Sequence, residues 1–301
     1  MAVYVVGDFL RETRLRKGYT QEEVSYGICT PASLSRIENG AQKPGRLILE
    51  KLFERLGTEN NSFVSGEEME LYSAIQSLIR DITDEDVAKL EEHISIVEKL
   101  ATNASELEHQ CLYFAKGELA RQKEKDYSKA MELYMKAIHI TLPDFDGKKP
   151  LRNNLLTFDE IMIINSIAIL YSNDERNIMD AIHLDLWLKE YMENRIVDGR
   201  MKTAKYPMIL YNLSCWFGDK NCHKEALKMA DEGVNFCIQY GNLAFFPILL
   251  FNEGGTLVEL GEIDKGKEHL HQAITIFKAM RRKDMVQTAI EWCKIHYQID
   301  F

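Results

Sequence analysis

The chain has 301 residues, of which 46% are hydrophobic, and a formal net charge of −10. This apolar share supports a packed core and excludes a chain that is disordered throughout. With only 17 Gly and 6 Pro, a many-turned all-β protein is disfavoured and long helices are expected. The sequence has no apolar run long enough to span a membrane and no secretory signal, so we expect a cytoplasmic protein without membrane contact.

Charge is unevenly distributed along the chain. Residues 1–57 carry 9 Lys and Arg against 7 Asp and Glu, so this part has a net charge of +2 and the rest a net charge of −12. A weakly basic N-terminal part on an acidic body is typical of a DNA-reading domain attached to a module that does not bind DNA.

The first two predicted helices are short. Segment 4–17 places apolar residues on one face, and Gly18 ends it, as glycine commonly does at a helix C-terminus. Thr20 and Glu23 have the spacing of a capping box, which predicts the start of a second helix. Gly27 ends that helix after two turns.

Two further helices complete this part of the chain. Thr30 and Pro31 supply an N-cap and a first-turn proline for a third helix, which runs to Gly40. Pro44 precedes an apolar-rich fourth helix that Gly57 closes. Two short helices joined by a tight turn and braced by flanking helices predict a helix-turn-helix.

The residues from Thr20 to Gly40, followed by Pro44, resemble a DNA-binding domain of the Cro/C1 (XRE) type. The Ser-Leu-Ser-Arg-Ile-Glu-Asn-Gly part and the short turn before it resemble the Rgg/PlcR group of RRNPP transcription regulators. The resemblance covers nearly all of residues 5–57. It implies a domain over residues 1–57 that binds double-stranded DNA. We expect a homodimer on a two-fold symmetric operator, because a single head makes few contacts.

The third helix should enter the major groove with its early residues at the base edges. Arg36 can donate two hydrogen bonds to a guanine. Gln21 resembles the phosphate-gripping glutamine of this fold, and Lys43 and Arg46 would contact the DNA backbone. The alternative is that Arg36 and Lys43 are ordinary solvated charges. The predicted DNA contacts are Gln21, Pro31, Ala32, Ser33, Ser35, Arg36, Lys43 and Arg46.

Residues 58–104 are predicted to be a hinge followed by linker helices. Segment 58–66 is polar and turn-rich, as expected for a hinge. Segments 67–80 and 83–100 then show helical spacing of apolar residues. In the resembled family, helices at this place often carry dimer contacts; the alternative is that they cap the next module.

From residue 105 to 301, helical pairs recur about every 40 residues, which predicts a solenoid. The later pairs are expected at 157–194, 204–240 and 244–281, with 285–298 as a last helix that caps the stack. The first pair, 106–140, resembles the tetratricopeptide signature through Gly117, Tyr127, Ala130, Tyr134 and Ala137. The fold class is therefore expected to be all-α, with a tetratricopeptide-like right-handed α-solenoid behind the helix-turn-helix.

Asn165, Asn212 and Asn252 recur at equivalent points of three first helices. Each follows two apolar residues and lies three residues before a small one. Asparagine is a poor helix former, and its amide offers one acceptor and two donors. Amides stacked in a concave groove can hold a peptide backbone, as in the resembled receptors for short re-imported signalling peptides. The alternative is a buried Asn that bridges adjacent repeats.

Other groove residues are less distinctive. Lys116 can pair with a peptide carboxylate, or it can be a surface lysine. The candidate apolar walls, whose alternative is inter-repeat core, are Tyr171, Tyr211 and Phe251, with Trp187, Tyr191 and Trp216 as further aromatics.

No sequence motif indicates an enzyme. The chain lacks a glycine-rich phosphate loop, HExxH and GxSxG, and its six cysteines and eight histidines lack metal-ligand spacing. We therefore expect no catalysis, metal or cofactor. The predicted function is a cytosolic transcription regulator controlled by a short signalling peptide, as in quorum sensing. The alternative is a regulator whose repeats bind a partner protein or only dimerise.

Overall fold

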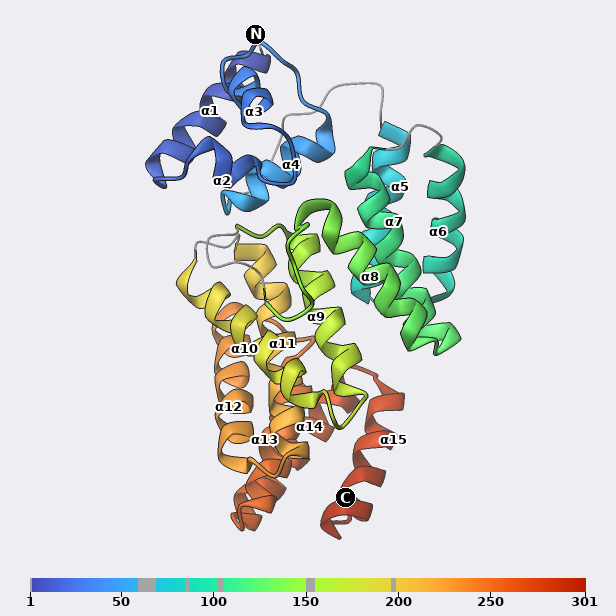
Figure 1. Ribbon diagram of the computed structural model, residues 1–301. Coiled ribbons are helices and arrows are strands. Elements are labelled where there is room, and N and C mark those ends of the chain that lie inside the picture. The colour runs from blue at the N-terminus through green and yellow to red at the C-terminus, as the bar shows by residue number, and fades with distance from the viewer. Residues whose placement is uncertain (1, 59–68, 85–86, 102–104, 150–154, 196–198) are drawn as a thin grey trace. The chain divides into compact units, whose positions relative to one another are not determined.

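The computed structural model describes the chain except residues 1, 59–68, 85–86, 102–104, 150–154 and 196–198 (Figure 1). Every element of the described residues is helical, which confirms the all-α prediction. The chain divides into two compact units, residues 1–173 with 196–198 and residues 174–195 with 199–301. None of the described helices combines the length and the apolar character needed to cross a membrane.

The first unit contains the helix-turn-helix, the linker helices and the first repeats. Its elements are α1 (Ala2–Arg16), α2 (Gln21–Ser25), α3 (Pro31–Glu38), α4 (Arg46–Arg55), α5 (Met69–Asp84), α6 (Val87–Leu100), α7 (Glu106–Leu119), the π-helical turn η1 (Ala120–Glu124), α8 (Tyr127–Thr141) and α9 (Phe158–Ser172). The predicted helix start at Thr83 is wrong, because the buried series Ile75, Leu78 and Ile82 carries α5 on to Asp84. The predicted hinge lies almost wholly outside the described residues, and the domain boundaries at 57 and 104 stay predictions.

Residues 1–57, which we call the head, pack four short helices around one apolar core. The most deeply buried members of that core are Leu10, Val24, Leu34, Ile37, Leu52, Phe53 and Leu56. The predicted capping box is present: the Glu23 amide donates to Thr20 Oγ1 (3.1 Å), and the Thr20 amide donates to Glu23 Oε2 (2.7 Å). Thr30 Oγ1 caps α3 by accepting from the Ser33 amide (3.1 Å). The caps thus place both helices of the motif where the sequence predicted them.

The first repeat pair, α7 and α8, meets at a glycine. A Cβ on Gly117 would lie 2.5 Å from a ring carbon of Tyr134, so only glycine allows the ring to pack there. Tyr134 is fully buried, and its hydroxyl donates to Glu118 Oε1 (2.7 Å). Gly117 therefore leaves the space that the Tyr134 ring fills, as the sequence signature predicts.

The second unit holds the remaining repeats. Its elements are α10 (Ile178–Asn194), α11 (Gly199–Asp219), α12 (His223–Tyr240), α13 (Phe246–Glu259), α14 (Ile263–Ala279), α15 (Lys283–Trp292) and the π-helical turn η2 (Cys293–Tyr297). Helix α11 begins five residues before the predicted 204, and Pro207 lies inside it. Helices α13 and α14 approach backbone to backbone, because a Cβ on Gly254 would lie 2.9 Å from the Gly266 carbonyl oxygen.

Candidate functional site

The predicted base-contacting helix, α3, turns polar and small residues outward. Its exposed or partly exposed positions are Pro31, Ala32, Ser33, Ser35 and Arg36. Arg36 Nε donates to Gln42 Oε1 (2.9 Å), and Nη2 donates to Ser33 Oγ (3.1 Å). These bonds hold the guanidinium against the surface of α3 and leave its other N–H groups for a ligand.

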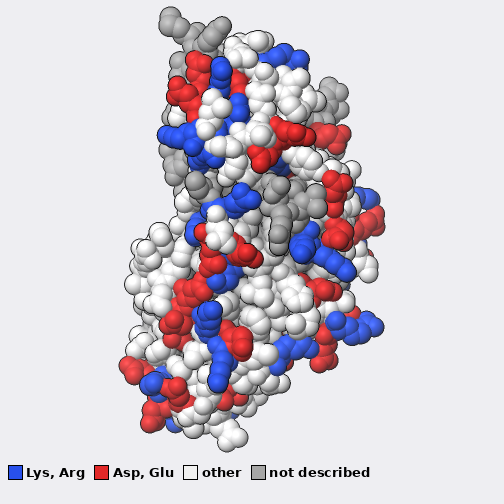
Figure 2. Space-filling view, turned by 60° about the vertical axis from the view of Figure 1, so that its left-hand side comes forward, with Lys and Arg blue, Asp and Glu red and all other residues white. Residues whose placement is uncertain are grey.

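The other predicted DNA contacts differ in how they are held. Lys43 is exposed, whereas Gln21 Nε2 donates to Glu38 Oε2 (2.7 Å) and would exchange that bond for a phosphate. The Arg46 guanidinium lies 3.5 Å from the centroid of the Tyr72 ring, as a cation–π contact. On the face shown in Figure 2, basic and acidic side chains are interspersed. All eight DNA contacts stay predictions.

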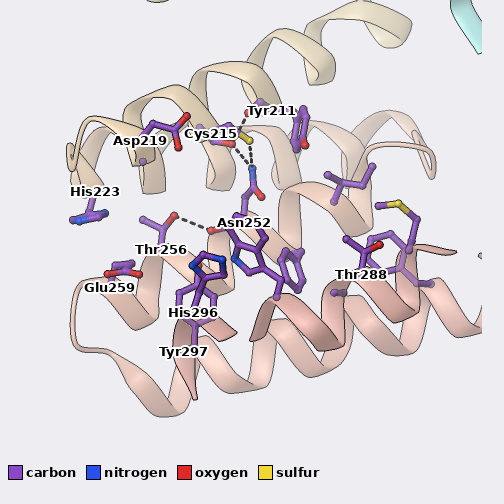
Figure 3. Close-up of a pocket in the computed structure, with 18 of the residues that line it drawn as sticks. Tyr211, Cys215, Asp219, His223, Asn252, Thr256, Glu259, Thr288, His296 and Tyr297 are labelled. Carbon is purple, nitrogen blue, oxygen red and sulfur yellow. Dashed lines mark hydrogen bonds between the residues drawn. The ribbon is translucent and has the colours of Figure 1, made fainter. Parts of the chain in front are cut away.

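A pocket of about 530 Å³ lies in the second unit, among α11, α13, α14, α15 and η2 (Figure 3). This volume is within the range of sites that bind small organic ligands. Its lining residues are Tyr211, Ser214, Cys215, Gly218, Asp219, Asn221, His223, Ile248, Phe251, Asn252, Thr256, Glu259, Phe277, Met285, Thr288, Ala289, Trp292, His296 and Tyr297. The pocket therefore combines apolar walls with a few polar groups.

Asn252 is the central polar group of the pocket. Its Nδ2 donates to Ser214 Oγ (2.8 Å) and lies 3.1 Å from Cys215 Sγ. Burial raises the pKa of the Cys215 thiol, which keeps this neighbour uncharged at neutral pH. With its donors directed at α11, the amide turns its oxygen away from those partners (Figure 3). This oxygen can accept a hydrogen bond from the backbone N–H of a peptide.

One end of the pocket is acidic. Asp219, Glu259 and His223 lie together there, and both carboxylates are exposed (Figure 3). The partial desolvation of Asp219 raises its pKa, and the charge of the neighbouring Lys220 partly offsets that effect. Among the described residues that line the pocket there is no Lys or Arg. At neutral pH this end therefore favours a positively charged group.

The pocket brings together three of the seven predicted peptide contacts, namely Tyr211, Phe251 and Asn252. Asn212 does not line it: that side chain is 8% exposed, and its Nδ2 donates to Asp185 Oδ2 (3.2 Å). The buried-amide alternative therefore fits Asn212 better than direct peptide contact.

The other three predicted contacts belong to the first unit. Asn165 is 1% exposed, so the packing alternative fits it. Lys116 Nζ lies 2.6 Å from Glu98 Oε1 in an exposed pair, which fits the surface-lysine alternative. Tyr171 is partly buried, with its hydroxyl close to Gly147. The three repeated asparagines therefore differ in exposure: Asn165 and Asn212 are buried, whereas Asn252 lines the pocket and stays the candidate for peptide contact.

Sequence reasoning missed the contribution of the C-terminal helix to the pocket. Residues such as Met285, Trp292 and Tyr297 line it, although the segment was expected only to cap the repeats. A Cβ on Gly255 would overlap the Tyr297 hydroxyl, so glycine at 255 makes room for this ring. The Gly254–Gly255 pair was the available sequence signal that another segment packs closely on α13.

Asp185, which accepts the hydrogen bond from Asn212, is expected to make the free energy of unfolding depend on pH. It is fully buried, Oδ1 has no hydrogen-bond partner among the described residues, and burial raises its pKa well above the ordinary value, against the opposing effect of the Asn212 bond. The folded state thus keeps a proton that the unfolded state releases above about pH 3.9. The stability that this bound proton contributes is fully present below about pH 3.9, and it is lost as the pH rises towards the raised pKa of Asp185 in the folded state.

Replacing Asp185 by Asn removes this proton linkage. We expect the Asp185→Asn variant to gain stability over the wild type as pH rises, by at most about 1.4 kcal/mol per pH unit. Urea unfolding between about pH 4 and about pH 8 measures the difference. Asp264→Asn, at an exposed position of α14, serves as the control. Parallel stability curves for wild type and Asp185→Asn would contradict the assignment.

Comparison with known proteins supports this architecture. Residues 10–59 match the helix-turn-helix family, which confirms the predicted Cro/C1 (XRE) type of domain. The fold is similar to Bacillus thuringiensis PlcR in complex with the peptide PapR7 and DNA, with a TM-score of 0.63, 17% identity and coverage of 95% of this chain and 98% of that chain. Comparison with curated protein sequences gives no match.

Two further structures share the fold. The apo competence regulator ComR from Streptococcus vestibularis has a TM-score of 0.52 and 16% identity, over 97% of this chain and 98% of that chain. ComR from S. thermophilus in complex with DNA and its signalling peptide ComS has a TM-score of 0.50 and 13% identity, over 94% and 97%. The predicted resemblance to the Rgg/PlcR group is thus confirmed in fold.

Proposed function

We propose that this chain is a cytoplasmic DNA-binding transcription regulator that a short signalling peptide controls, as in quorum sensing. The observation that carries the proposal is the pocket of about 530 Å³ in the repeats, with Asn252 presenting an acceptor between apolar walls. The helix-turn-helix match at residues 10–59 supports the DNA-binding part. The similar PlcR and ComR structures contain both a peptide and DNA, which favours the same pair of partners here.

The pocket chemistry favours a particular class of peptide. An extended backbone can donate an N–H to Asn252 Oδ1, while apolar side chains pack against Tyr211 and Phe251. The acidic end at Asp219 and Glu259 suits a positive group, such as a free N-terminal ammonium. The proposed ligand is therefore a short, mainly apolar peptide with a positive charge near one end.

On the DNA side, α3 enters the major groove, and two heads of a homodimer bind the halves of a two-fold symmetric operator. A peptide can shift DNA binding only if it has different affinities for two arrangements of the dimer. Control by peptide therefore requires that the liganded and unliganded repeats favour different arrangements.

Binding of synthetic heptapeptides of random sequence tests the peptide part. We expect the protein to enrich apolar, positively ended peptides from the mixture, as identified by mass spectrometry. For the best-bound sequence, Asn252→Ala should weaken binding about fivefold, because it removes the amide oxygen that accepts one peptide hydrogen bond worth about 1 kcal/mol.

Asn235→Ala is the matched control, because Asn235 is exposed on α12 and does not line the pocket. It should leave peptide affinity unchanged. Equal affinity for wild type and Asn252→Ala would remove Asn252 from the site. The absence of any enriched peptide, together with tight binding of a folded protein, would favour the partner-protein alternative.

A further inference from the structure

Two buried cations of α4 in the head pair with carboxylates in the first turn of α9. Lys51 Nζ lies 2.9 Å from Asp159 Oδ2, and Arg55 Nη2 lies 2.7 Å from Glu160 Oε1. The four side chains are at most 4% exposed. Two buried ion pairs between residues far apart in the sequence therefore join the head to the repeats of the first unit.

Hydrogen bonds extend this contact beyond the ion pairs. The Phe158 amide, at the start of α9, donates to Glu54 Oε2 (2.8 Å). Because the first amides of a helix have no partner inside it, the head supplies an acceptor that α9 needs. Arg55 also donates to the Tyr26 carbonyl oxygen, and the Tyr26 hydroxyl donates to Asp144 Oδ2 (2.7 Å). A backbone amide of α9 and a carboxylate of the segment after α8 thus each bond to a side chain of the head.

Close packing completes the contact. Gly27 has a φ of 69°, and a Cβ there would overlap the carbonyl oxygen of Thr141. Leu107 and Leu155, which lie outside the head, belong to the same apolar cluster as the head core. The contact therefore excludes water and admits only a glycine at position 27.

The buried charges make this contact specific. Burial alone would lower the pKa of Lys51, but Asp159, Glu54 and Glu50 raise it well above its ordinary value, so Lys51 stays charged. An unpaired ion in this place would be strongly unfavourable. Slipping the head along α9 would leave charges buried without partners, so the docked arrangement has one register.

The contact leaves the predicted DNA-facing surface open. The docked residues come from the end of α2 and from α4, whereas the hydrogen bonds of Arg36 go to Ser33 and Gln42 inside the head. Pro31 and Ala32 are exposed in the same arrangement. Docking within this unit therefore does not cover the start of α3.

We propose that Thr141, Asp144, Leu155, Asp159 and Glu160 form a docking surface for the head of the same chain, which holds α3 at a fixed angle to the repeats. In a dimer, the separation of the two recognition helices sets the spacing of the DNA half-sites. A docked head makes that spacing depend on the arrangement of the repeats. This consequence for DNA rests on the proposed function, whereas docking itself does not.

A pair of glycine variants tests docking without any DNA. Gly27 and Gly18 both have positive φ, of 69° and 75°, but a Cβ on Gly18 would meet no described atom within 4 Å. Both Gly→Ala changes therefore add similar backbone strain, and only Gly27→Ala pushes against the repeats. In hydrogen exchange of the full-length protein, Gly27→Ala should speed exchange in the first turn of α9 and Gly18→Ala should not. Equally slow exchange in both variants overturns docking.

A charge variant keeps the test decisive if Gly27→Ala unfolds the head. Lys51→Glu places a carboxylate among Asp159, Glu54 and Glu50, so it should speed the same exchange. Adding Asp159→Lys restores an opposite pair and should slow the exchange again. Exchange that the second change does not slow would contradict specific docking by this pair.

The consequence for DNA is measured on duplexes that the wild-type protein selects from a random pool. When base pairs are inserted between the half-sites, the wild type should bind about tenfold more weakly than to the selected duplex. Gly27→Ala and Lys51→Glu, in which the head is undocked, should each lose less than about twofold. An undocked variant with the wild-type spacing preference would overturn the fixed-angle proposal. Failure to select any DNA would overturn the proposed function instead, and the exchange result would still decide docking.

Discussion

Glu118→Gln is expected to lower the free energy of unfolding by about 3–5 kcal/mol, because it leaves a largely buried arginine without its counter-charge. Glu118 Oε2 accepts from Arg121 Nη2 (2.6 Å) and from Gln122 Nε2 (2.8 Å). Its Oε1 accepts from the hydroxyls of Tyr134 (2.7 Å) and Ser166 (2.6 Å). One carboxylate thus joins α7, η1, α8 and α9.

The pKa of Glu118 shows which effect dominates. Burial alone would raise it, but Arg121 and the hydrogen bonds from Ser166 and Tyr134 hold it below the ordinary value. The network therefore stabilises the charged form despite the cost of burial. Its contribution is present above the unfolded pKa of about 4.3 and is lost as pH falls through the lower folded pKa. The difference between wild type and Glu118→Gln should accordingly shrink in acid.

Glu132→Gln is the matched control for this prediction. Glu132 lies on α8 in an exposed ion pair with Lys136, so the same chemical change should alter stability by less than about 1 kcal/mol. Urea unfolding at neutral pH compares the two variants. A loss for Glu118→Gln no larger than that for Glu132→Gln would show that the buried network does not hold the repeats together.

Arg36→Ala is expected to weaken binding to the selected operator by about 1–3 kcal/mol, roughly 5-fold to 150-fold, and to relax the preference at one base pair. The physical reason is that the bonds to Ser33 and Gln42 hold the Arg36 guanidinium at the exposed side of α3 and leave its other N–H groups to donate to a base. A bidentate contact of this kind distinguishes guanine from the other bases.

Lys43→Ala separates base recognition from attraction to phosphate. Lys43 is exposed just after α3, so its removal should lower affinity on every sequence alike and reduce the salt slope by about one. Fluorescence anisotropy on the selected operator and its single-base variants, at several salt concentrations, measures both effects. A uniform loss for Arg36→Ala on all sequences would assign Arg36 to the DNA backbone instead.

The local structure was predictable from short-range chemistry. The capping box at Thr20 and Glu23 marks the start of α2, and Thr30 with Pro31 marks the start of α3. The packing of Tyr134 against Gly117 was also predictable, because both residues stand at the positions that the tetratricopeptide signature gives to a small residue and an aromatic ring. Such signals depend on residues close in sequence, and these were the parts that the sequence predicted best.

The pocket was less predictable, because its shape depends on segments far apart in the sequence. Asn165 and Asn252 share the same local pattern, yet Asn165 is buried and Asn252 lines a cavity. What differs is the surrounding packing: on α13, Gly255 admits Tyr297 from the C-terminal turn, which encloses the site. The ion-pair partners of Lys51 and Arg55 could not be predicted from the sequence either. Asp159 and Glu160 both lie in α9, far from α4 along the chain.

The most direct test of the account is the affinity of the full-length protein for its selected operator, with and without a saturating amount of the best-bound heptapeptide. We expect the peptide to change the dissociation constant of the complex between the wild-type protein and the operator by about tenfold or more. Asn252→Ala should require more peptide for the same change in operator affinity, whereas Asn235→Ala should respond as the wild type does. An operator affinity that stays the same at saturating peptide would contradict peptide control.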